Sequence, residues 1–398
     1  MKLTNCFLAL VMSIIIISCK EEKKLPVVEP EISKVATPVF SFSFVGCNRI
    51  DRHNQSASNP STANTYALER IYKDMVALPH KPELFFFLGD LVLAESDTIN
   101  LNSQLKAWKA LYDSDPISTS GIELVAVPGN HEMLYSKELY DTTQHHSPNH
   151  VPNKNDSIWK EFPLKGSTNT WLKYMKNYMP SGRETAPDTL GLDNRLTFSF
   201  IRHNVGFVVM NTDTYNPPKA TNPYGEGLEG QLPVTWVNAK VIAFKKDPTI
   251  DHIFVLGHRP YYVGGSPDTG HGGLPQGGEL WPNFQANRVV AMLSAHQHDY
   301  ERWQPINDSL GGGTYQIVAG HGGSVNDRHI PHSPPFLGYS LITVMSDGSI
   351  ELDTRGYCTG DTYLTPVPAN AMTSRDTITM TWAQNPNTFP DPYLGCQE

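Results

Sequence analysis

The chain has 398 residues and 39% of them are hydrophobic, so it can bury an ordinary globular core and is not a disordered chain. Its formal net charge of −9 argues against a surface built to bind nucleic acid. With 30 glycines and 31 prolines, it should carry long shaped loops between short helices and strands.

The N-terminal residues have the pattern of an export signal rather than of a folded element. Lys2 is followed by an apolar run over 7–17 and by the small residue Ser18, which is the order found in secretion signals. We expect a signal peptide over 1–18 and a solvated tether, rich in Lys and Glu, over 19–38. An uncleaved N-terminal membrane anchor is the alternative.

The residues around the expected cleavage point resemble a bacterial lipobox. Ile16-Ile17-Ser18-Cys19 has its form, and Lys20-Glu21-Glu22 is similar to the surface-export signal of Bacteroidetes lipoproteins. The resemblance implies that Cys19 is lipidated and that the protein is an exported lipoprotein of the outer membrane or cell surface. Beyond this signal, Cys358 and Cys396 could pair in an oxidising compartment, which leaves Cys47 odd.

Strand and helix patterns alternate through the first half of the chain. The expected order is a strand at 40–45, a helix at 63–78, a strand at 84–88, a helix at 103–112 and a strand at 124–127. Such alternation indicates parallel strands joined by crossover helices. The polar stretch 133–193, with an amphipathic helix at 171–178, is interpreted as a long insertion above the sheet.

The second half combines hairpins with further alternation. The expected elements are a hairpin of 196–201 with 205–210, a helix at 234–244, strands at 252–256, 289–293 and 315–318, and a closing hairpin of 340–344 with 349–353. The glycine-rich stretch 263–280 is expected to be a mobile loop. Together these elements predict an α/β (α+β) fold, a four-layer αββα sandwich of two mixed sheets flanked by helices. We place a single catalytic domain at 39–357 and a C-terminal extension at 358–398.

Three short segments carry polar side chains directly after apolar runs of strand character. They are Leu88-Gly89-Asp90, Pro128-Gly129-Asn130-His131-Glu132 and Ser294-Ala295-His296-Gln297-His298. Side chains at the carboxyl ends of strands in an open α/β sheet meet at one edge, where ligands bind. Carboxylate, amide and imidazole ligands together suit zinc, iron or manganese. The three segments therefore predict a metal site.

Taken singly, these residues have ordinary explanations. Asp90 could cap the next helix, Asn130 follows Pro-Gly as in a turn, and His258 between Gly and Pro could be a loop histidine. His296 and His298 are more specific, because alternate positions of an extended chain place both rings on one side.

Jointly, the segments resemble the calcineurin-like metallophosphoesterases, whose pattern is D-x-H, G-D-x-x-D/Y, G-N-H-D/E, G-H and G-H-x-H in order. Four of these five blocks are present between residues 89 and 298. His296-Gln297-His298-Asp299-Tyr300-Glu301-Arg302 is close to the H-x-H-x-Y-E-R of purple acid phosphatases, and Gly320-His321-Gly322-Gly323 is similar to their downstream glycine turn. The likeness extends over about residues 40–356 and favours the purple-acid-phosphatase and PhoD-like branches.

The chain departs from the family pattern at three places. Gly46-Cys47-Asn48 stands where D-x-H should follow the first strand; it resembles the strand-end S-C-N/Q of PhoD-like enzymes and makes Cys47 the expected ligand. The alternatives are a displaced D-x-H at Asp51-Arg52-His53 and an inert buried thiol. Leu93 replaces the Asp or Tyr three residues after Asp90, and Ala295 stands where Gly is usual.

The resemblance implies two metal positions that share one carboxylate. Cys47, Asp90 and His298 would serve the first position, and Asp90, Asn130, His258 and His296 the second. The cofactors would be two divalent or trivalent ions of Fe, Zn or Mn, and a thiolate at the first position would favour iron or zinc over magnesium. Because the first position departs from the family, a labile metal or a single-metal enzyme is the alternative.

The resemblance also implies metal-dependent hydrolysis of a small-molecule phosphate ester, in which a metal-activated hydroxide attacks phosphorus and His131 is the general acid. Further candidates for contact with substrate are Arg49, Tyr215, Arg259 and His321. A phosphomonoesterase is the expected function. The alternatives are a phosphodiesterase acting on nucleotides or glycerophosphodiesters, and a non-catalytic surface lipoprotein with a degenerate metal site.

Overall fold

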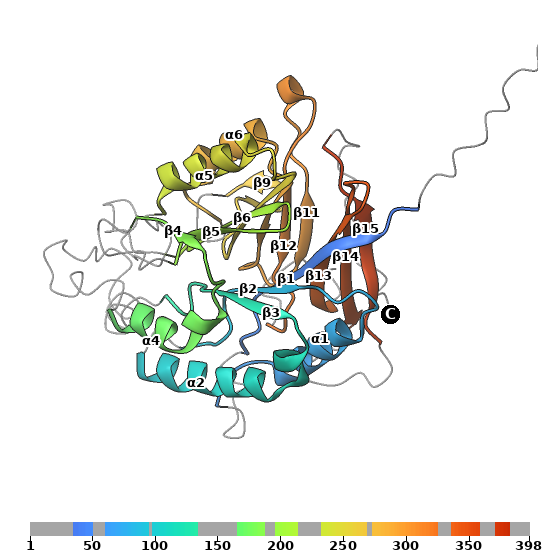
Figure 1. The fold of residues 1–398 in the computed structure, drawn as a ribbon. Coiled ribbons are helices and arrows are strands. Elements are labelled where there is room, and N and C mark those ends of the chain that lie inside the picture. Colours follow the sequence, from blue (N-terminus) through green and yellow to red (C-terminus); the bar gives the residue numbers. More distant parts are fainter. Residues whose placement is uncertain are drawn as a thin grey trace, which may run out of the picture. The chain divides into compact units, whose positions relative to one another are not determined.

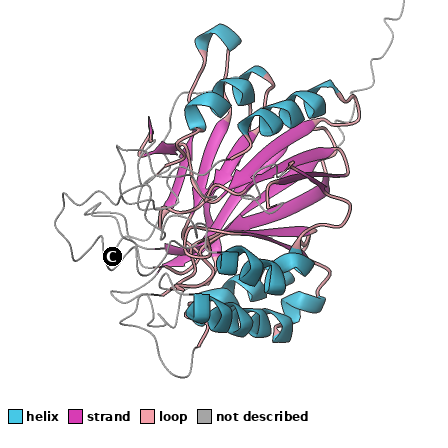
Figure 2. Cartoon of the chain, turned by 90° about the vertical axis from the view of Figure 1, so that its left-hand side faces the viewer, coloured by secondary structure: helices cyan, strands magenta, loops and turns pink. Residues whose placement is uncertain are grey.

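Two mixed β-sheets lie face to face at the centre of this computed structural model, and helices cover their outer faces (Figure 1). The turned view shows the strands as middle layers with helices above and below them (Figure 2). The structure describes residues 35–50, 60–94, 98–133, 165–187, 196–213, 232–268, 273–324, 336–358 and 371–382. The predicted four-layer αββα architecture is confirmed.

The first sheet has six strands in the order β15–β14–β13–β1–β2–β3. Their bounds are β1 Pro38–Val45, β2 Leu84–Leu88, β3 Glu123–Val127, β13 Phe336–Met345, β14 Ile350–Cys358 and β15 Thr373–Thr379. β1, β2 and β3 are parallel, and the other pairings are antiparallel. The helices on its outer side are α1 Thr65–Ala77, α2 Thr98–Ser114 and α4 Lys165–Met175 (Figure 1).

The second sheet has seven strands in the order β11–β12–β10–β7–β6–β5–β4. Their bounds are β4 Glu184–Thr185, β5 Phe198–Arg202, β6 Val205–Met210, β7 His252–Gly257, β10 Ala291–Ser294, β11 Tyr300–Trp303 and β12 Tyr315–Ala319. Helices α5 Val234–Lys246 and α6 Gly277–Ala286 cover its outer face, and β8 Tyr262–Val263 pairs with β9 Ser266–Pro267 in a small hairpin. The described residues contain no helix long and apolar enough to cross a membrane.

Aromatic side chains fill the space between the two sheets. The ring of Phe42 on β1 lies 5.1 Å from Phe207 on β6 and 5.0 Å from Phe254 on β7, between ring centroids. Phe86 on β2 reaches Phe207 at 5.2 Å. Such aromatic pairs add about 0.5–1.5 kcal/mol each beyond the area they bury. This aromatic layer fixes the two sheets against each other, and with them the loops at their edges.

The apolar run Leu84-Phe85-Phe86-Phe87-Leu88 is continuous because β2 is covered on both faces. Phe86 faces the second sheet, whereas Phe85 contacts Tyr72 of α1 and Phe87 contacts Trp108 of α2. The continuous apolar run that predicted a strand thus also reflects burial of both faces of β2, one by helices and the other by the second sheet.

The parallel strands end together. Val45 of β1 pairs with Phe87 of β2, and Leu88 pairs with Val127 of β3, so the loops after these strands leave the first sheet at one edge. In the second sheet β7, β10 and β12 are parallel neighbours, so the loops that follow them also share an edge. Every polar segment singled out in the sequence follows one of these strands.

The elements predicted from the sequence are present, and the structure adds others that were missed. The stretch 263–280, expected as one loop, holds the hairpin β8–β9 and the start of α6. The sequence does not predict α6 because the helix begins with glycines and contains Pro282. Its Leu280, Trp281 and Phe284 are buried against the second sheet. β11 and β15 were also missed; β15 lies within the expected extension 358–398 and adds an edge strand to the domain.

The cysteines divide as expected where the structure describes them. Cys47 is free and buried, and Cys358 at the end of β14 is disulfide-bonded to a cysteine outside the described residues. Cys19 and Cys396 lie outside the described residues. The pairing of Cys358 with Cys396 and the lipidation of Cys19 therefore stay predictions.

Replacing Phe42 by alanine should remove two of the aromatic contacts that join the two sheets. Phe42 is fully buried, and we expect the free energy of unfolding to fall by about 3–5 kcal/mol in urea titrations. Val39→Ala is the matched control on the same strand, because its side chain is 52% exposed and its loss should cost no more than about 0.5 kcal/mol. Equal losses for the two variants would contradict this account of the core.

Candidate metal centre

Six candidate ligands lie in loops that follow five parallel strands of the two sheets. Two groups among them bring donor atoms within 4.8 Å of one another: Cys47 with Asp90 and His298, and Asp90 with His258 and His296. Asp90, after β2, belongs to both groups. The first sheet supplies Cys47 and Asp90, and the second sheet supplies the three histidines, so the site forms where the sheet edges meet.

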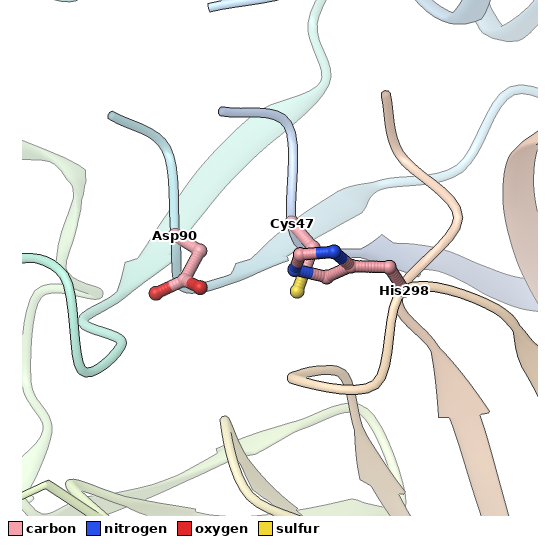
Figure 3. Close-up of side chains that lie close together, drawn as sticks. All are labelled: Cys47, Asp90 and His298. Carbon is pink, nitrogen blue, oxygen red and sulfur yellow. The ribbon is translucent and has the colours of Figure 1, made fainter. Parts of the chain in front are cut away.

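The first group is buried and compact. Figure 3 shows the Cys47 sulfur beside the ring of His298, with the Asp90 carboxylate across from them. The Cys47 sulfur accepts a hydrogen bond of 3.1 Å from the backbone N–H of His296. Burial and the nearby Asp90 carboxylate raise the pKa of the Cys47 thiol well above its usual range, so the thiol keeps its proton until a cation binds beside it.

The second group gathers around the Asn130 side chain. The Asn130 Oδ1 lies 3.0 Å from His258 Nε2 and 3.1 Å from His296 Nδ1, and these two ring nitrogens are 3.1 Å apart. The Asp90 Oδ1 is 3.4 Å from His258 Nε2. One carboxylate oxygen, one amide oxygen and two imidazole nitrogens therefore converge on one point, as predicted for the second metal position.

The hydrogen bonding of His258 shows that this donor set fits a cation. Its Nδ1 donates to the Leu88 carbonyl at 2.7 Å, so the tautomer that can bind a metal carries its lone pair on Nε2. That lone pair faces the Asn130 oxygen, which is also an acceptor. Two acceptors cannot hydrogen-bond to each other, whereas both can bind one metal ion, and the Leu88 carbonyl then acts as the outer partner that fixes the ring.

Charge at the centre is concentrated on Asp90. Burial alone would raise the pKa of its carboxyl, but His258, His131 and Arg49 around it hold the pKa far below the usual range. Asp90 is 1% exposed and is therefore a buried anion. Buried anions of this kind are retained where cations or hydrogen-bond donors surround them.

Three candidate ligands have a left-handed backbone. The φ angles are 57° for Cys47, 56° for Asp90 and 66° for His296. This region costs a residue with a Cβ about 1–3 kcal/mol, and such strain is concentrated at functional sites. The sharp turns aim the three side chains into the space between the sheets.

Small residues allow the ligand loops to approach each other. A Cβ on Gly89 would lie 2.6 Å from the Cα of Gly129 and 2.6 Å from Nδ1 of His258, so only glycine fits there. The departure at Ala295 has a similar explanation: a Cβ on Gly46 would lie 2.5 Å from the Ala295 Cβ. The space that Gly46 leaves open is filled by the Ala295 methyl group.

Glu132 is a site residue that the sequence reasoning missed, although it ends the Gly-Asn-His-Glu block. Its fully buried carboxylate accepts four backbone N–H bonds, from Asp90 at 2.9 Å, Leu91 at 2.7 Å, Val92 at 3.1 Å and Gly129 at 2.8 Å. Burial and the nearby Asp90 charge raise the pKa of Glu132 to about 8. The four backbone bonds, two to each oxygen, oppose this rise because they favour the ionised carboxylate. Glu132 thereby ties the loop of Asp90 to the loop of Asn130.

His131 is held with one ring nitrogen toward the centre. Its Nδ1 donates to the Leu93 carbonyl at 2.7 Å, its backbone N–H donates to the Asp90 Oδ1 at 3.2 Å, and its Nε2 lies 4.0 Å from the Asp90 Oδ2. The Leu93 position thus orients His131 through its backbone oxygen. Burial and the Arg49 charge lower the pKa of His131 to about 4, so its ring is neutral near pH 7 when no other ligand is bound.

The other predicted site residues have different surroundings. Arg49 lies at the centre, with Nε 3.6 Å from the Asp90 Oδ2 and 19% of its side chain exposed. Tyr215, Asp51 and His53 lie outside the described residues. Arg259 and His321 are buried, so the structure does not support contact with substrate for these two.

Arg259 supports His296 instead. Its Nε binds the Asp213 carboxylate at 2.6 Å, and its Nη1 lies 3.1 Å from His296 Nε2. In this arrangement the guanidinium donates to Nε2 and the ring proton sits on Nδ1. A cation at Nδ1 would move that proton to Nε2, so Arg259 would have to release His296 and keep Asp213.

His321 is enclosed by aromatic rings. Its ring centroid lies 5.6 Å from that of Tyr300 and 4.9 Å from that of Phe336, and neither ring nitrogen has a hydrogen-bond partner in the part of the chain that the structure describes. Burial lowers the pKa of His321 to about 3. The residue is therefore a neutral core histidine.

Comparison with known proteins agrees with this geometry. The family model for calcineurin-like phosphoesterases matches residues 51–300, and the chain belongs to this family. The match begins at Asp51, so Cys47 precedes it and Asp51-Arg52-His53 stands at its start.

Individual relatives are distant. An uncharacterized protein of Mycobacterium tuberculosis, found in two strains, is 26% identical over 116 residues, which is 29% of this chain and 22% of the relative. The structure of purple acid phosphatase PPD1 from yellow lupin (Lupinus luteus) seeds has a TM-score of 0.50 at 18% identity, covering 80% of this chain and 51% of that one. A structure of PhoD has a TM-score of 0.47 at 14% identity, covering 88% of this chain and 73% of that one. The chain thus spans about a fifth of the curated relative and half of the lupin enzyme, and the latter likeness shows the shared fold.

Glu132→Gln should loosen the two ligand loops together. The amide would place an NH₂ group against two backbone N–H donors, and we expect the free energy of unfolding to fall by about 3 kcal/mol and metal affinity by about 10–100-fold. Glu123→Gln is the matched control, because its side chain is 40% exposed and its pair with Arg202 should contribute no more than about 1 kcal/mol. Urea titration and metal titration measure the two effects; a Glu132 variant that behaves like the control would show that this carboxylate does not hold the loops together.

His321→Leu should make the protein more resistant to acid. In the unfolded chain the His321 imidazole takes up a proton as the pH falls below about 6.5, whereas in the folded protein it does so only near pH 3. The free energy of unfolding therefore decreases as the pH is lowered from about 6.5 to about 3. At pH 4.5 the variant should gain about 2–3 kcal/mol relative to the unmodified protein beyond any difference seen at pH 7. Urea titrations at the two pH values measure this gain, with exposed His80→Leu as the control. A pH-independent difference between unmodified protein and variant would show that His321 does not titrate as described.

Proposed function

We propose that this protein is a phosphomonoesterase that holds two metal ions at the centre, in the manner of the purple-acid-phosphatase and PhoD-like branches. The observation that carries the proposal is Asp90, a buried carboxylate that belongs to both donor groups. Cys47, Asp90 and His298 would hold the first ion, and Asp90, Asn130, His258 and His296 the second. Bound there, a metal pair would lower the pKa of a water and balance the charge of the phosphoryl oxygens.

Arg49 is the residue that would bind a phosphoryl oxygen. Its guanidinium lies next to Asp90 and is partly exposed, and its Nε has no hydrogen-bond partner in the described part of the chain. A planar guanidinium binds two phosphate oxygens at once. A monoester offers more negative charge and more free oxygens than a diester, which favours the monoester beside this cation.

His131 would exchange the proton of the leaving oxygen. Its Nδ1–H is fixed by the Leu93 carbonyl, which leaves Nε2 for the substrate. Without substrate the pKa of about 4 keeps the ring neutral. A phosphate dianion placed against it would raise that pKa, because a nearby negative charge favours the imidazolium, and the protonated Nε2 could then serve as general acid.

The first metal position would be the distinctive one. A thiolate from Cys47 favours iron or zinc over magnesium, and the geometry that supports this ligand is its place beside Asp90 and His298 (Figure 3). Asp51 and His53 remain the alternative ligands, since the family match begins with them.

Paired variants test the proposal. Metal analysis of the unmodified protein should give two transition-metal ions, and p-nitrophenyl phosphate should be hydrolysed faster than bis-p-nitrophenyl phosphate. Asn130→Ala should lose metal and activity together. His131→Ala should keep both ions and lose about 10²–10⁴ in kcat, because it removes only the proton transfer.

The variant His80→Ala, at an exposed histidine, is the control and should keep both metal and activity. A diester rate above the monoester rate would replace the monoesterase assignment by a diesterase. Less than one metal ion per chain, with neither ester hydrolysed, would overturn the metal centre. The same metal analysis on Cys47→Ala, Asp51→Ala and His53→Ala identifies which residue completes the first position.

A further inference from the structure

Edge strand β15 carries a buried charge. Of its seven residues, Asp376 is the one whose side chain is buried, while its neighbours are exposed or half-buried. The pairing of β14 with β15 shifts register next to Asp376, between Thr354 and Arg355. Such a bulge re-aims a side chain. A buried carboxylate on an edge strand requires a partner.

That partner comes from the other sheet. The Asp376 Oδ2 accepts a hydrogen bond of 2.7 Å from the Tyr300 hydroxyl and one of 2.7 Å from Arg302 Nε, and its Oδ1 accepts one of 3.2 Å from Arg302 Nη2. Tyr300 and Arg302 both lie on β11, the edge strand of the second sheet. Asp376 therefore joins the edges of the two sheets through a bidentate ion pair and a hydroxyl.

Strand β11 begins directly after the segment that carries the histidines. His298 lies two residues before Tyr300, and the Asp299 carbonyl between them accepts a 2.9 Å bond from the Gly320 N–H. β11 has four residues and pairs with β12 alone in the described sheet. Asp376 therefore helps to fix the position of β11 relative to the first sheet, which supplies Cys47 and Asp90, together with the packing of Tyr300 against Phe336 of β13.

We propose that Asp376 is a positioning residue for the first metal position: by holding Tyr300 and Arg302 it keeps His298 facing Cys47 and Asp90. The inference rests on the proposed metal centre. Removing the carboxylate would leave the Arg302 charge buried without its partner and Tyr300 without its acceptor. β11 would then move toward solvent at its first residues, and the ring of His298 would follow.

The chain offers a matched control. On the outer side of the first sheet, Asp74 of α1 accepts bonds of 2.7 Å from the Tyr339 hydroxyl, 2.7 Å from Arg355 Nε and 3.1 Å from Arg355 Nη2. The Tyr-Arg-carboxylate pattern is the same as at Asp376, although Arg355 also pairs with Asp353 at 3.3 Å. Tyr339 and Arg355 lie on β13 and β14, which carry no candidate ligand. Asp74→Asn and Asp376→Asn should therefore both reduce stability but differ at the metal centre.

Cobalt titration of the full-length chain separates these effects. The thiolate-to-cobalt charge-transfer absorption reports binding beside Cys47, with Cys47→Ala as baseline, and equilibrium dialysis counts total cobalt. Asp376→Asn should weaken the binding that gives this absorption by about 10-fold, as loss of an outer partner does, and leave the second ion in place. Tyr300→Phe, which keeps the ion pair, should have a smaller effect in the same direction. Asp74→Asn should match the unmodified protein.

Two other results would overturn the inference. If Asp376→Asn and Asp74→Asn lower the Tm equally and bind cobalt like the unmodified protein, the Asp376 contact is structural only and the proposed function stands. If the unmodified protein binds no cobalt, the proposed metal centre fails and the inference fails with it.

Discussion

The centre depends on one electrostatic constraint: lone pairs of Asp90, Asn130 and His258 converge in a buried space, and the proton on His296 Nδ1 cannot satisfy them all. His258 donates its ring proton to the Leu88 carbonyl and turns a bare nitrogen toward the Asn130 oxygen. Beside them lies the buried, ionised Asp90. Positive charge resolves this conflict, and the surrounding structure, from the carboxylate of Glu132 to the left-handed turns, holds the donors in place against their mutual repulsion.

Sequence patterns were sufficient for the architecture and for choosing candidate ligands that the structure brings together. The run of five apolar residues in β2 and the alternation in β1 reflect burial directly, so strands and crossovers could be read from them. The ligand segments were recognisable because each follows such a strand. Elements with a weak sequence signal were missed: β15 is a polar edge strand, and α6 contains Pro282 and begins with glycines.

The parts of the site that could not be predicted are those that depend on backbone contacts. Leu93 departs from the family pattern, but it orients His131 through its backbone carbonyl oxygen, a group that every residue has. Arg259 and His321 carry the side chains of a substrate site, yet burial behind His296 and among aromatic rings gives them other tasks. Residue type indicates which chemistry a side chain can perform. Only the packing shows whether that side chain is exposed at the centre or buried behind other residues.

The two sheets contribute candidate ligands from opposite halves of the chain, beginning at Cys47 and ending at His298. No half contains a complete donor group: Cys47 and Asp90 need His298, and His258 and His296 need Asp90. During synthesis the early strands therefore emerge with a charged aspartate and a thiol whose partners are about 200 residues away, so high-affinity capture of an ion must be one of the last steps of folding, after long-range closure of the sandwich.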